Sequence, residues 1–381
     1  MPVTLLQTQG FRNLVFEDAT FCPGVNLIFG NNGSGKSSVL EAIGVLSSGR
    51  SFRSHRHEAL VTHGHDSFTI FGIVEGEGRS AFHTEGPPHQ DLRFSHRLGI
   101  SRDLRAKETL LKLDGERRRS MSDLARLLPV SVIDPGTFDV IAGGPAKRRQ
   151  FLDWMVFHVE HEFGRAWQQM QRVVSQRNQL LRNARIDAAQ LKVWNERYAA
   201  LADMVTLARR AAFEQLQPVI QSLLSQHSDS WCRSVTLDFF QGWDSQKPLL
   251  SVLAEHLDQE VKSGHTLYGP GRCDIRVRVD GKNANEVLSR GQQKTLIVLM
   301  KLAQVQVIGD LTSKRCTFLL DDINAELDQH HRQILADRLQ ALNSQIFVTS
   351  IERPEPEVLW GASVGNLKMF HVEQGRLTEE T

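Results

Sequence analysis

Apolar positions recur with two different periods along this chain of 381 residues. Short, nearly continuous apolar runs at 25–29, 316–320 and 345–350 predict β-strands that are buried on both faces. Between residues 163 and 212 the apolar positions fall at heptad-like spacing, with a polar break near 185–187, which predicts two antiparallel helices. The chain therefore predicts an α/β domain whose parts lie at both ends of the sequence, with helices inserted between them.

Three other segments extend this pattern. Residues 67–132 consist of short strand-like runs, including an Asp114-Gly115 pair that is typical of a hairpin turn, and predict an antiparallel β lobe. Residues 275–279 alternate apolar and basic side chains and predict another strand. Pro218 is expected to interrupt the helix that follows the heptad region. The arginines on the outward side of the two helices are expected to be solvated, and contact with DNA or a partner is the alternative. These arginines are Arg165, Arg172, Arg177, Arg182 and Arg185.

The composition is ordinary for a soluble globular protein, with 23% charged residues, 40% hydrophobic residues and a net charge of +1. A surface for DNA or a membrane must therefore come from local clustering of charge. The four cysteines are scattered, which favours a reducing compartment and disfavours a structural zinc site. The N-terminus lacks the pattern of a secretory signal, and the most apolar window, 295–311, contains Lys301, Gln304 and Gln306. We therefore expect a cytoplasmic protein with a buried helix over that window.

The segment from Gly30 to Ser37 fits the pattern G-x-x-x-x-G-K-S of a phosphate-binding loop and lies between a predicted strand and a predicted helix. Its glycines permit backbone angles at which N–H groups converge on phosphate oxygens, and the helix N-terminus adds partial positive charge. Lys36 is predicted to reach the β- and γ-phosphates of a nucleoside triphosphate, and Ser37 to hold Mg²⁺. A glycine-rich turn that merely carries Lys-Ser is the alternative, which the flanking strand and helix disfavour. The predicted nucleotide contacts here are Gly30, Asn31, Asn32, Gly33, Ser34, Gly35, Lys36, Ser37 and Ser38.

Two further motifs narrow the class of nucleotide-binding protein. Residues 288–292, Leu-Ser-Arg-Gly-Gln, precede a long apolar helix, and a later apolar strand ends in Asp321-Asp322, followed by Glu-Leu-Asp at 326–328. With the phosphate loop, these motifs resemble the ATP-binding-cassette class, in which the signature serine and glycine meet the γ-phosphate held by a partner subunit. Ser289 is a good N-cap, and Gly291 lets backbone N–H groups approach phosphate.

The same resemblance implies roles for the two carboxylates. Asp321 would coordinate Mg²⁺, and Asp322 takes the position of the glutamate that polarises the attacking water. Aspartate is one methylene shorter than glutamate, and Thr349-Ser350 stand where a histidine usually follows the last core strand. We therefore predict slow ATP hydrolysis that acts as a timer on a dimer, with Asp322, Lys36 and Ser289 as catalytic residues.

Motifs spread over the whole chain resemble one family more closely, the RecF family of bacterial recombination mediators. They are residues 10–13, 143–145 with 148–154, 267–270 with Asp274, 288–294 and 319–322. The resemblance implies further nucleotide contacts from Arg12 and Gln292. One departure is Gly271, where the family typically has a histidine.

This resemblance implies an ABC-type ATPase head, built from a mixed sheet with the phosphate loop plus an antiparallel β lobe, and an inserted helical arm. The predicted head comprises 1–135 and 265–381, and the predicted arm comprises 136–264. The resemblance further implies an ATP-dependent homodimer that binds gapped DNA or single-strand/double-strand junctions. It would act with RecR and RecO to load RecA, without membrane contact.

Two basic clusters are candidate ligand contacts. The first would bind DNA through its phosphates, with ordinary exposed charge as the alternative. Its members are Arg102, Arg105, Lys107, Arg117, Arg118 and Arg119. The second, Lys147 to Arg149, opens a helix whose dipole it opposes, so we expect an anionic partner there: a carboxylate, a nucleotide or DNA.

Three rival functions share parts of this pattern. The nucleotide-binding subunit of a transporter would normally carry a glutamine-bearing loop, but residues 133–136 are Ile-Asp-Pro-Gly at that place. The ATPase half of a defence nuclease would need a further acidic metal site, and only a short tail follows Ser350. A structural scaffold switched by ATP would show no useful turnover.

Overall fold

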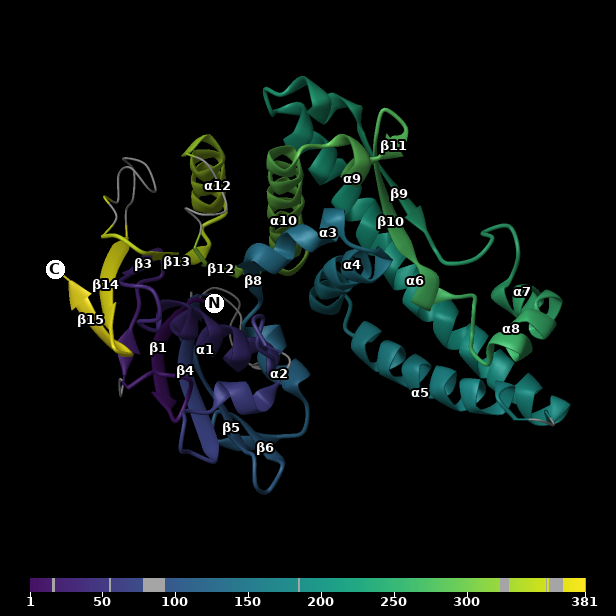
Figure 1. Ribbon diagram of the computed structural model, residues 1–381, viewed down its shortest axis with the longest axis horizontal. Helices are drawn as coiled ribbons and strands as arrows, with labels where there is room; N and C mark the ends of the chain where they lie inside the picture. Colours follow the sequence, from purple (N-terminus) through teal and green to yellow (C-terminus); the bar gives the residue numbers. More distant parts are fainter. Residues whose placement is uncertain are drawn as a thin grey trace, which may run out of the picture. The chain divides into compact units, whose positions relative to one another are not determined.

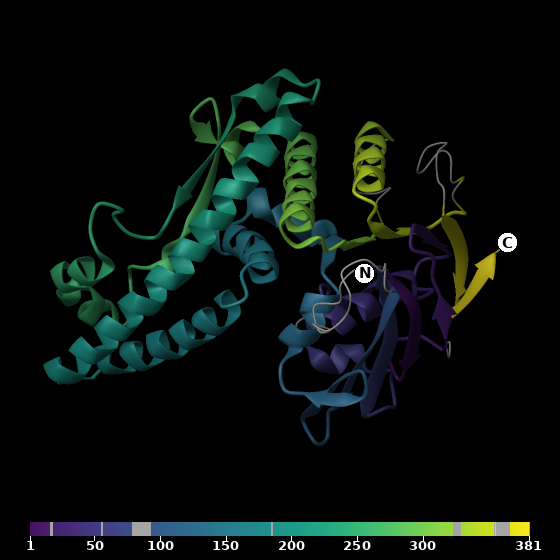
Figure 2. The same ribbon diagram turned by 180° about the vertical axis from the view of Figure 1, so that it is seen from behind.

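The computed structural model describes residues 1–15, 18–54, 56–77, 93–183, 186–322, 329–353, 355 and 366–380. The chain divides into two compact units, Met1–Thr137 with Ser313–Thr381, and Phe138–Thr312. Both are drawn in Figure 1 and, from behind, in Figure 2. Residues 265–312, which the sequence places with the head, pack instead with the predicted arm. The reason is that α10 (Arg290–Thr312) lies against helices α4 (Pro145–Val159) and α6 (Ala188–Ser225) of the second unit.

The first unit is built around a six-stranded sheet. Its order is β15 (Arg376–Glu380), β14 (Leu367–Glu373), β3 (Val25–Phe29), β13 (Gln345–Ser350), β12 (Thr317–Leu320) and β8 (Val130–Ile133). The five strands from β14 to β8 are parallel, and β15 pairs antiparallel with β14. Every residue of β3, β12 and β13 is buried, as the continuous apolar runs predict for parallel strands. The carboxyl ends of these strands meet at one edge of the sheet.

The second sheet of this unit is antiparallel and confirms the predicted β lobe, except at the end of the predicted range, where Met121–Leu127 is helical and β8 joins the parallel sheet. Its order is β2 (Ala19–Thr20), β1 (Val3–Gln9), β4 (Ser67–Glu77), β5 (Arg93–Asp103), β6 (Glu108–Leu113) and β7 (Glu116–Arg118). The β6–β7 connection is the predicted Asp114-Gly115 turn, with φ of +53° and +86°.

Helix α1 (Lys36–Ser48) supplies much of the core of the first unit. Ten of its 13 residues are buried, so the protein encloses it on all sides, and the buried residues include the polar side chains of Ser38, Glu41 and Ser47. It contacts β4 and β5 of the antiparallel sheet and β8 and β13 of the parallel sheet. The other helices here are η1 (His57–Leu60), α2 (Met121–Leu127), η2 (Pro135–Phe138, which reaches the boundary) and α12 (Gln329–Ala341). Residues 324–328, with the predicted Glu-Leu-Asp motif, lie outside the described part.

The second unit combines helices with a small sheet of β11 (Lys282–Asn283), β10 (Asp274–Val279) and β9 (Val235–Phe240). Its long helices are α4 (Pro145–Val159), α5 (Phe163–Leu181), α6 (Ala188–Ser225) and α10. Its shorter helices are α3 (Asp139–Ala142), η3 (Ser230–Ser234), α7 (Leu249–Glu255), α8 (Leu257–Ser263), η4 (Pro270–Arg272) and α9 (Ala284–Val287). Helices α5 and α6 form the predicted antiparallel pair and lie side by side in both views.

Two details of this helix pair differ from the sequence prediction. Pro218 lies inside α6, and the helix continues past it to Ser225. Proline has no N–H to donate to the carbonyl of Glu214, four residues earlier, but Glu214 is exposed to water. Arg177 does not face solvent but lies on the buried stripe of α5, with its side chain fully buried. It pairs with Glu260 and donates to Asn195 Oδ1 and Thr266 Oγ1. Arg165, Arg172 and Arg182 are exposed, as predicted.

One helix of the described residues, α10, is long and apolar enough to cross a membrane by length and composition alone. Its most apolar window is 67% buried inside the protein, which is typical of a core helix. Gln304, one of the polar residues in that window, is fully buried and donates to the carbonyl of Phe151 on α4.

Candidate nucleotide-binding site

The phosphate-binding loop joins the end of β3 to the start of α1, as the sequence predicts. Gly30 has φ +149° and Gly35 has φ +120°, values that residues with a Cβ rarely adopt. A Cβ on Gly30 would also lie 2.3 Å from the carbonyl oxygen of Val372 on β14. Glycine at this position is therefore required by the fold as well as by any ligand.

Asn13 holds this loop from outside it, a role that the sequence motifs do not predict. Its side-chain amide donates to the carbonyl of Gly33 over 3.1 Å and accepts from the Ser38 hydroxyl over 2.9 Å. Gly375, in the turn between β14 and β15, donates its N–H to the carbonyl of Ser34 over 2.7 Å. The loop is thus fixed by segments from both ends of the chain. The only sequence signal for Asn13 was its place in the motif at 10–13.

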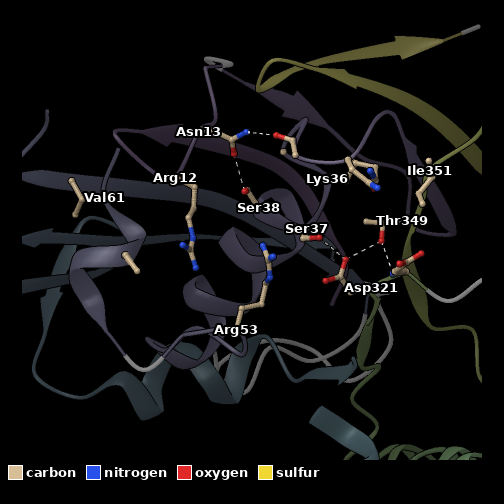
Figure 3. A pocket seen from close by; sticks show the side chains of 15 residues that line it. Arg12, Asn13, Lys36, Ser37, Ser38, Arg53, Val61, Asp321, Thr349 and Ile351 are labelled. Atoms are coloured by element: carbon tan, nitrogen blue, oxygen red, sulfur yellow. Dashed lines mark hydrogen bonds between the residues drawn. The ribbon is translucent and has the colours of Figure 1, made fainter. Parts of the chain in front are cut away.

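A cavity of about 600 Å³ opens beside the loop, within the size range of small-ligand sites. All of its lining residues belong to the first unit. Figure 3 shows Lys36, Ser37 and Asp321 on one side of this cavity and the guanidinium groups of Arg12 and Arg53 on another. The predicted contacts Asn32, Gly33, Gly35 and Ser38 also line it.

Lys36 is half-buried and its ammonium points back to the loop. It donates to the carbonyl oxygens of Gly30 over 2.7 Å and Asn31 over 2.9 Å. Burial lowers the pKa of Lys36, and the nearby carboxylates of Asp322 and Asp321 only partly oppose this effect. The cation therefore sits where an additional negative charge would be favourable.

The two carboxylates at the end of β12 lie at the same edge as the loop. Asp321 is buried, and its Oδ1 accepts the Ser37 hydroxyl over 2.8 Å and the Thr349 hydroxyl over 3.0 Å. Asp322 adopts φ +50°, and its N–H donates to Thr349 Oγ1 over 2.8 Å. Carboxylate and hydroxyl oxygens are the donors that Mg²⁺ prefers, so Ser37 and Asp321 fit the predicted metal role. In the sequence, Thr349 is visible only as one of two residues at a place where a histidine is usual.

Arg12 is engaged by the protein itself. Its guanidinium makes a two-pronged ion pair with Glu41, Nε to Oε2 over 2.7 Å and Nη2 to Oε1 over 2.6 Å. Glu41 is fully buried and also accepts a short hydrogen bond from Ser51. Arg53, which the sequence analysis did not single out, is exposed and lines the same cavity. The structure thus gives Arg12 a structural role, and its predicted nucleotide contact stays a prediction.

The signature residues lie in the second unit, at the N-terminus of α10. Ser289 Oγ accepts the N–H of Gln292 over 3.3 Å, and the Gln292 side chain accepts the N–H of Ser289 over 2.9 Å. This reciprocal arrangement is a capping box, which confirms Ser289 as the N-cap. Gly291 is exposed, and a Cβ there would meet only Ser289 Oγ, at 4.0 Å. Nothing in the described part of the chain therefore requires glycine at 291.

The cluster at 147–149 finds its anionic partners within the second unit. Arg148 makes a two-pronged ion pair with Asp274, Nε to Oδ1 over 2.7 Å and Nη2 to Oδ2 over 3.1 Å. Lys147 lies 3.6 Å from Asp139, and Arg149 donates to the carbonyl of Cys273. Of the alternatives left open by the sequence, the structure supports the carboxylate.

The candidate DNA contacts of the β lobe differ in how they are paired. Arg105, Arg117 and Arg118 form ion pairs with Asp66, Glu108 and Glu116 respectively. Arg102 donates to Thr109 Oγ1 over 3.2 Å. In the described ranges, Lys107 and Arg119 are exposed and have no ionic partner.

A strand–loop–helix phosphate site, a strand ending in two aspartates and a capped signature helix together define an ABC-like ATPase head of the SMC type. The family model described as RecF/RecN/SMC N terminal domain matches residues 2–377. The chain is 52% identical over 381 residues to the DNA replication and repair protein RecF of Marinobacter nauticus, covering 100% of both chains. It is 39% identical to the protein of the same name in Stutzerimonas stutzeri, covering 100% of this chain and 98% of that one. The chain belongs to the RecF family.

Solved structures show the same fold. The recombination mediator RecF with ATP superposes with a TM-score of 0.84 at 23% identity, over 100% of this chain and 97% of that one. An Smc head bound to the C-terminal winged-helix domain of ScpA matches with a TM-score of 0.55 at 16% identity, over 100% and 98% of the two chains. The predicted fold class is confirmed.

Proposed function

We propose that this protein is an ATP-dependent DNA-binding protein of replication and recombinational repair. The observation that carries the proposal is the site at the sheet edge, where Lys36, Ser37 and Asp321 gather beside a nucleotide-sized cavity. The names of its full-length relatives, replication and repair proteins, support the same conclusion. A protein that acts on bacterial DNA would work in the cytoplasm.

The chemistry of the site follows from its charges. The loop N–H groups and Lys36 bind the phosphates, and Ser37 with Asp321 would hold Mg²⁺, which neutralises charge that develops on the phosphates. Asp322 orients the attacking water. Its shorter side chain, and the hydroxyl of Thr349 in place of an imidazole, make hydrolysis slow. Hydrolysis then limits the lifetime of a bound state.

The bound state is a homodimer in which each nucleotide-binding site is completed by the signature residues of the partner chain. Ser289, Gly291 and Gln292 form a helix N-terminus in the unit that does not line the cavity, and Ser289 and Gly291 are exposed there. No contact within the described residues requires glycine at position 291, whereas the close approach of a phosphate would require it. Dimerisation would therefore require ATP and not ADP.

DNA binding would follow dimerisation. Among the basic residues of the β lobe, Lys107 and Arg119 are the strongest candidates, because the other arginines already have protein partners. Contacts of this kind are to phosphates and do not read sequence, which suits a preference for gaps and single-strand/double-strand junctions. RecR is the expected direct partner, with RecO and RecA downstream.

The experiment compares wild type with Asp322→Asn on gapped and intact duplex DNA. We expect wild type to bind gapped DNA only with ATP, and Asp322→Asn to lose turnover while its dimers and DNA complexes persist. Binding that is equal with ATP, with ADP and without nucleotide would contradict the proposal. The alternative, a transporter subunit, would show no DNA dependence at all.

A further inference from the structure

Thr349 lies at the carboxyl end of β13, the strand between β3 and β12 in the parallel sheet. The first of these neighbours leads into the phosphate loop and the second ends at Asp321. The β12–β13 register pairs Leu320 with Val348, so Asp321 and Thr349 follow side by side. The Thr349 side chain is almost fully buried. Its hydroxyl therefore lies where the side of the site that carries the phosphate loop meets the side that carries Asp321, as Figure 3 shows.

This hydroxyl is used twice. It donates to Asp321 Oδ1 over 3.0 Å and accepts the N–H of Asp322 over 2.8 Å, which matches its single hydrogen and its lone pairs. The Ser37 hydroxyl donates to the same Oδ1 over 2.8 Å. Two donors on one oxygen fix the orientation of the Asp321 carboxylate. Within the described residues its Oδ2 has no protein donor and is left for a cation.

The second bond acts on the backbone of Asp322. This residue has φ +50°, a left-handed conformation that a side chain disfavours, although aspartate tolerates it better than most residues. The Asp322 N–H is held by Thr349 Oγ1 and by nothing else in the described structure. The direction in which the Asp322 side chain leaves the backbone therefore depends on Thr349.

We propose that Thr349 is a positioning residue for ATP hydrolysis. Its hydroxyl orients the Asp321 carboxylate and fixes the backbone of Asp322, so it controls where the water-directing carboxylate lies. The inference rests on the proposed function, in which Asp321 and Asp322 serve the hydrolysis step. Because the phosphates are held by the loop and Lys36, loss of the hydroxyl slows hydrolysis without comparable loss of ATP affinity.

The test uses the full chain with Thr349→Val, which keeps the shape and removes the hydroxyl, and Thr349→Ser, which keeps the hydroxyl. Single-turnover hydrolysis, binding of a fluorescent ATP analogue with Mg²⁺, and dimer lifetime by light scattering are measured for each. We expect Thr349→Val to hydrolyse ATP about tenfold or more slowly, with affinity within about threefold and longer-lived dimers. Thr349→Ser should stay within about threefold of wild type in all three.

Three results would overturn the inference: unchanged hydrolysis in Thr349→Val, equal slowing in Thr349→Ser, or a loss of affinity as large as the loss of rate. If Thr349→Val does not fold, Thr349→Cys replaces it, since a thiol is a weaker donor of similar size. Thr349→Cys must then hydrolyse ATP more slowly than Thr349→Ser while binding ATP with equal affinity. Equal hydrolysis rates for these two variants would contradict the positioning role of Thr349.

Asp322→Asn, measured in parallel, separates the two proposals. If Asp322→Asn is inactive and Thr349→Val is unchanged, only the positioning role of Thr349 fails. If Asp322→Asn hydrolyses ATP like wild type, the proposed function of Asp322 fails whatever Thr349 does.

Discussion

The ammonium of Lys36 is the one cation of the phosphate loop. It is half-buried, donates to the carbonyl oxygens of Gly30 and Asn31, and has a pKa lowered by burial. Carbonyl oxygens only partly replace lost hydration of a cation. A phosphate that takes their place would make charge-assisted bonds, which are stronger.

The variant Lys36→Met should therefore lose ATP affinity by about 1.5–3 kcal/mol, the range for hydrogen bonds to charged groups. Lys112→Met, at an exposed lysine of the β lobe, is the matched control and should bind ATP like wild type. Isothermal titration calorimetry measures both. Lys36→Met affinity within about threefold of wild type would show that the loop does not bind phosphate as described.

Residues in local motifs were predictable from the sequence, and residues whose role depends on strand register were not. Lys36 and Ser37 belong to a loop motif that follows one predicted strand, and Asp321 directly follows another, so their common edge could be inferred. Thr349 acquires its role from lateral pairing with β12, and Asn13 acquires its role from packing on a loop 20 residues away. The spacing of residues along the chain predicts neither of these contacts.

At the scale of elements, the α5–α6 pair was predicted from the sequence, but its buried side was predicted only in part. Arg177 was assigned to the outward face because of its residue type. Its position on α5 places it on the buried stripe, with Ala166, Met170 and Val173. An arginine is tolerated there because Glu260, Asn195 and Thr266 satisfy its guanidinium, and these partners come from distant segments.

Arg177→Met should lower the free energy of unfolding by about 3–5 kcal/mol, because it leaves the Glu260 carboxylate buried without its cation. Arg172→Met, on the exposed side of the same helix, should change it by less than about 0.5 kcal/mol. Urea unfolding of the full chain compares them. Equal midpoints for the two variants would mean that the buried pair contributes no specific stability.

The N-terminus of α10 gives a second prediction at this scale. Gly291→Leu should leave thermal stability unchanged or slightly raised, because the added side chain meets no described atom closer than 4.0 Å from its Cβ and leucine favours helix more than glycine. ATP-dependent dimerisation should be lost, because the side chain blocks the approach of a partner's phosphate. Gly271→Ala, at another exposed glycine with open space around it, is the control. If Gly291→Leu still dimerises with ATP, the proposed contact between this helix N-terminus and the nucleotide of the partner chain is contradicted.

At the scale of the whole molecule, the chain separates its proposed functions between two compact units. The phosphate loop and both aspartates lie in one unit, and the capped signature helix lies in the other. The sequence predicted the discontinuity, since its strands lie at both ends of the chain. It did not predict that 265–312 packs with the arm, because α10 is assigned by which helices it touches and not by its own apolar pattern.

The central claim is that ATP closes a dimer by completing each site across two copies of the chain. The most direct test is molar mass by light scattering with ATP, with ADP and without nucleotide, for wild type and Lys36→Met, repeated with gapped DNA. We predict a dimer only for wild type with ATP, and DNA held only by that dimer. A mass that does not respond to ATP, or DNA binding that survives Lys36→Met unchanged, would contradict it.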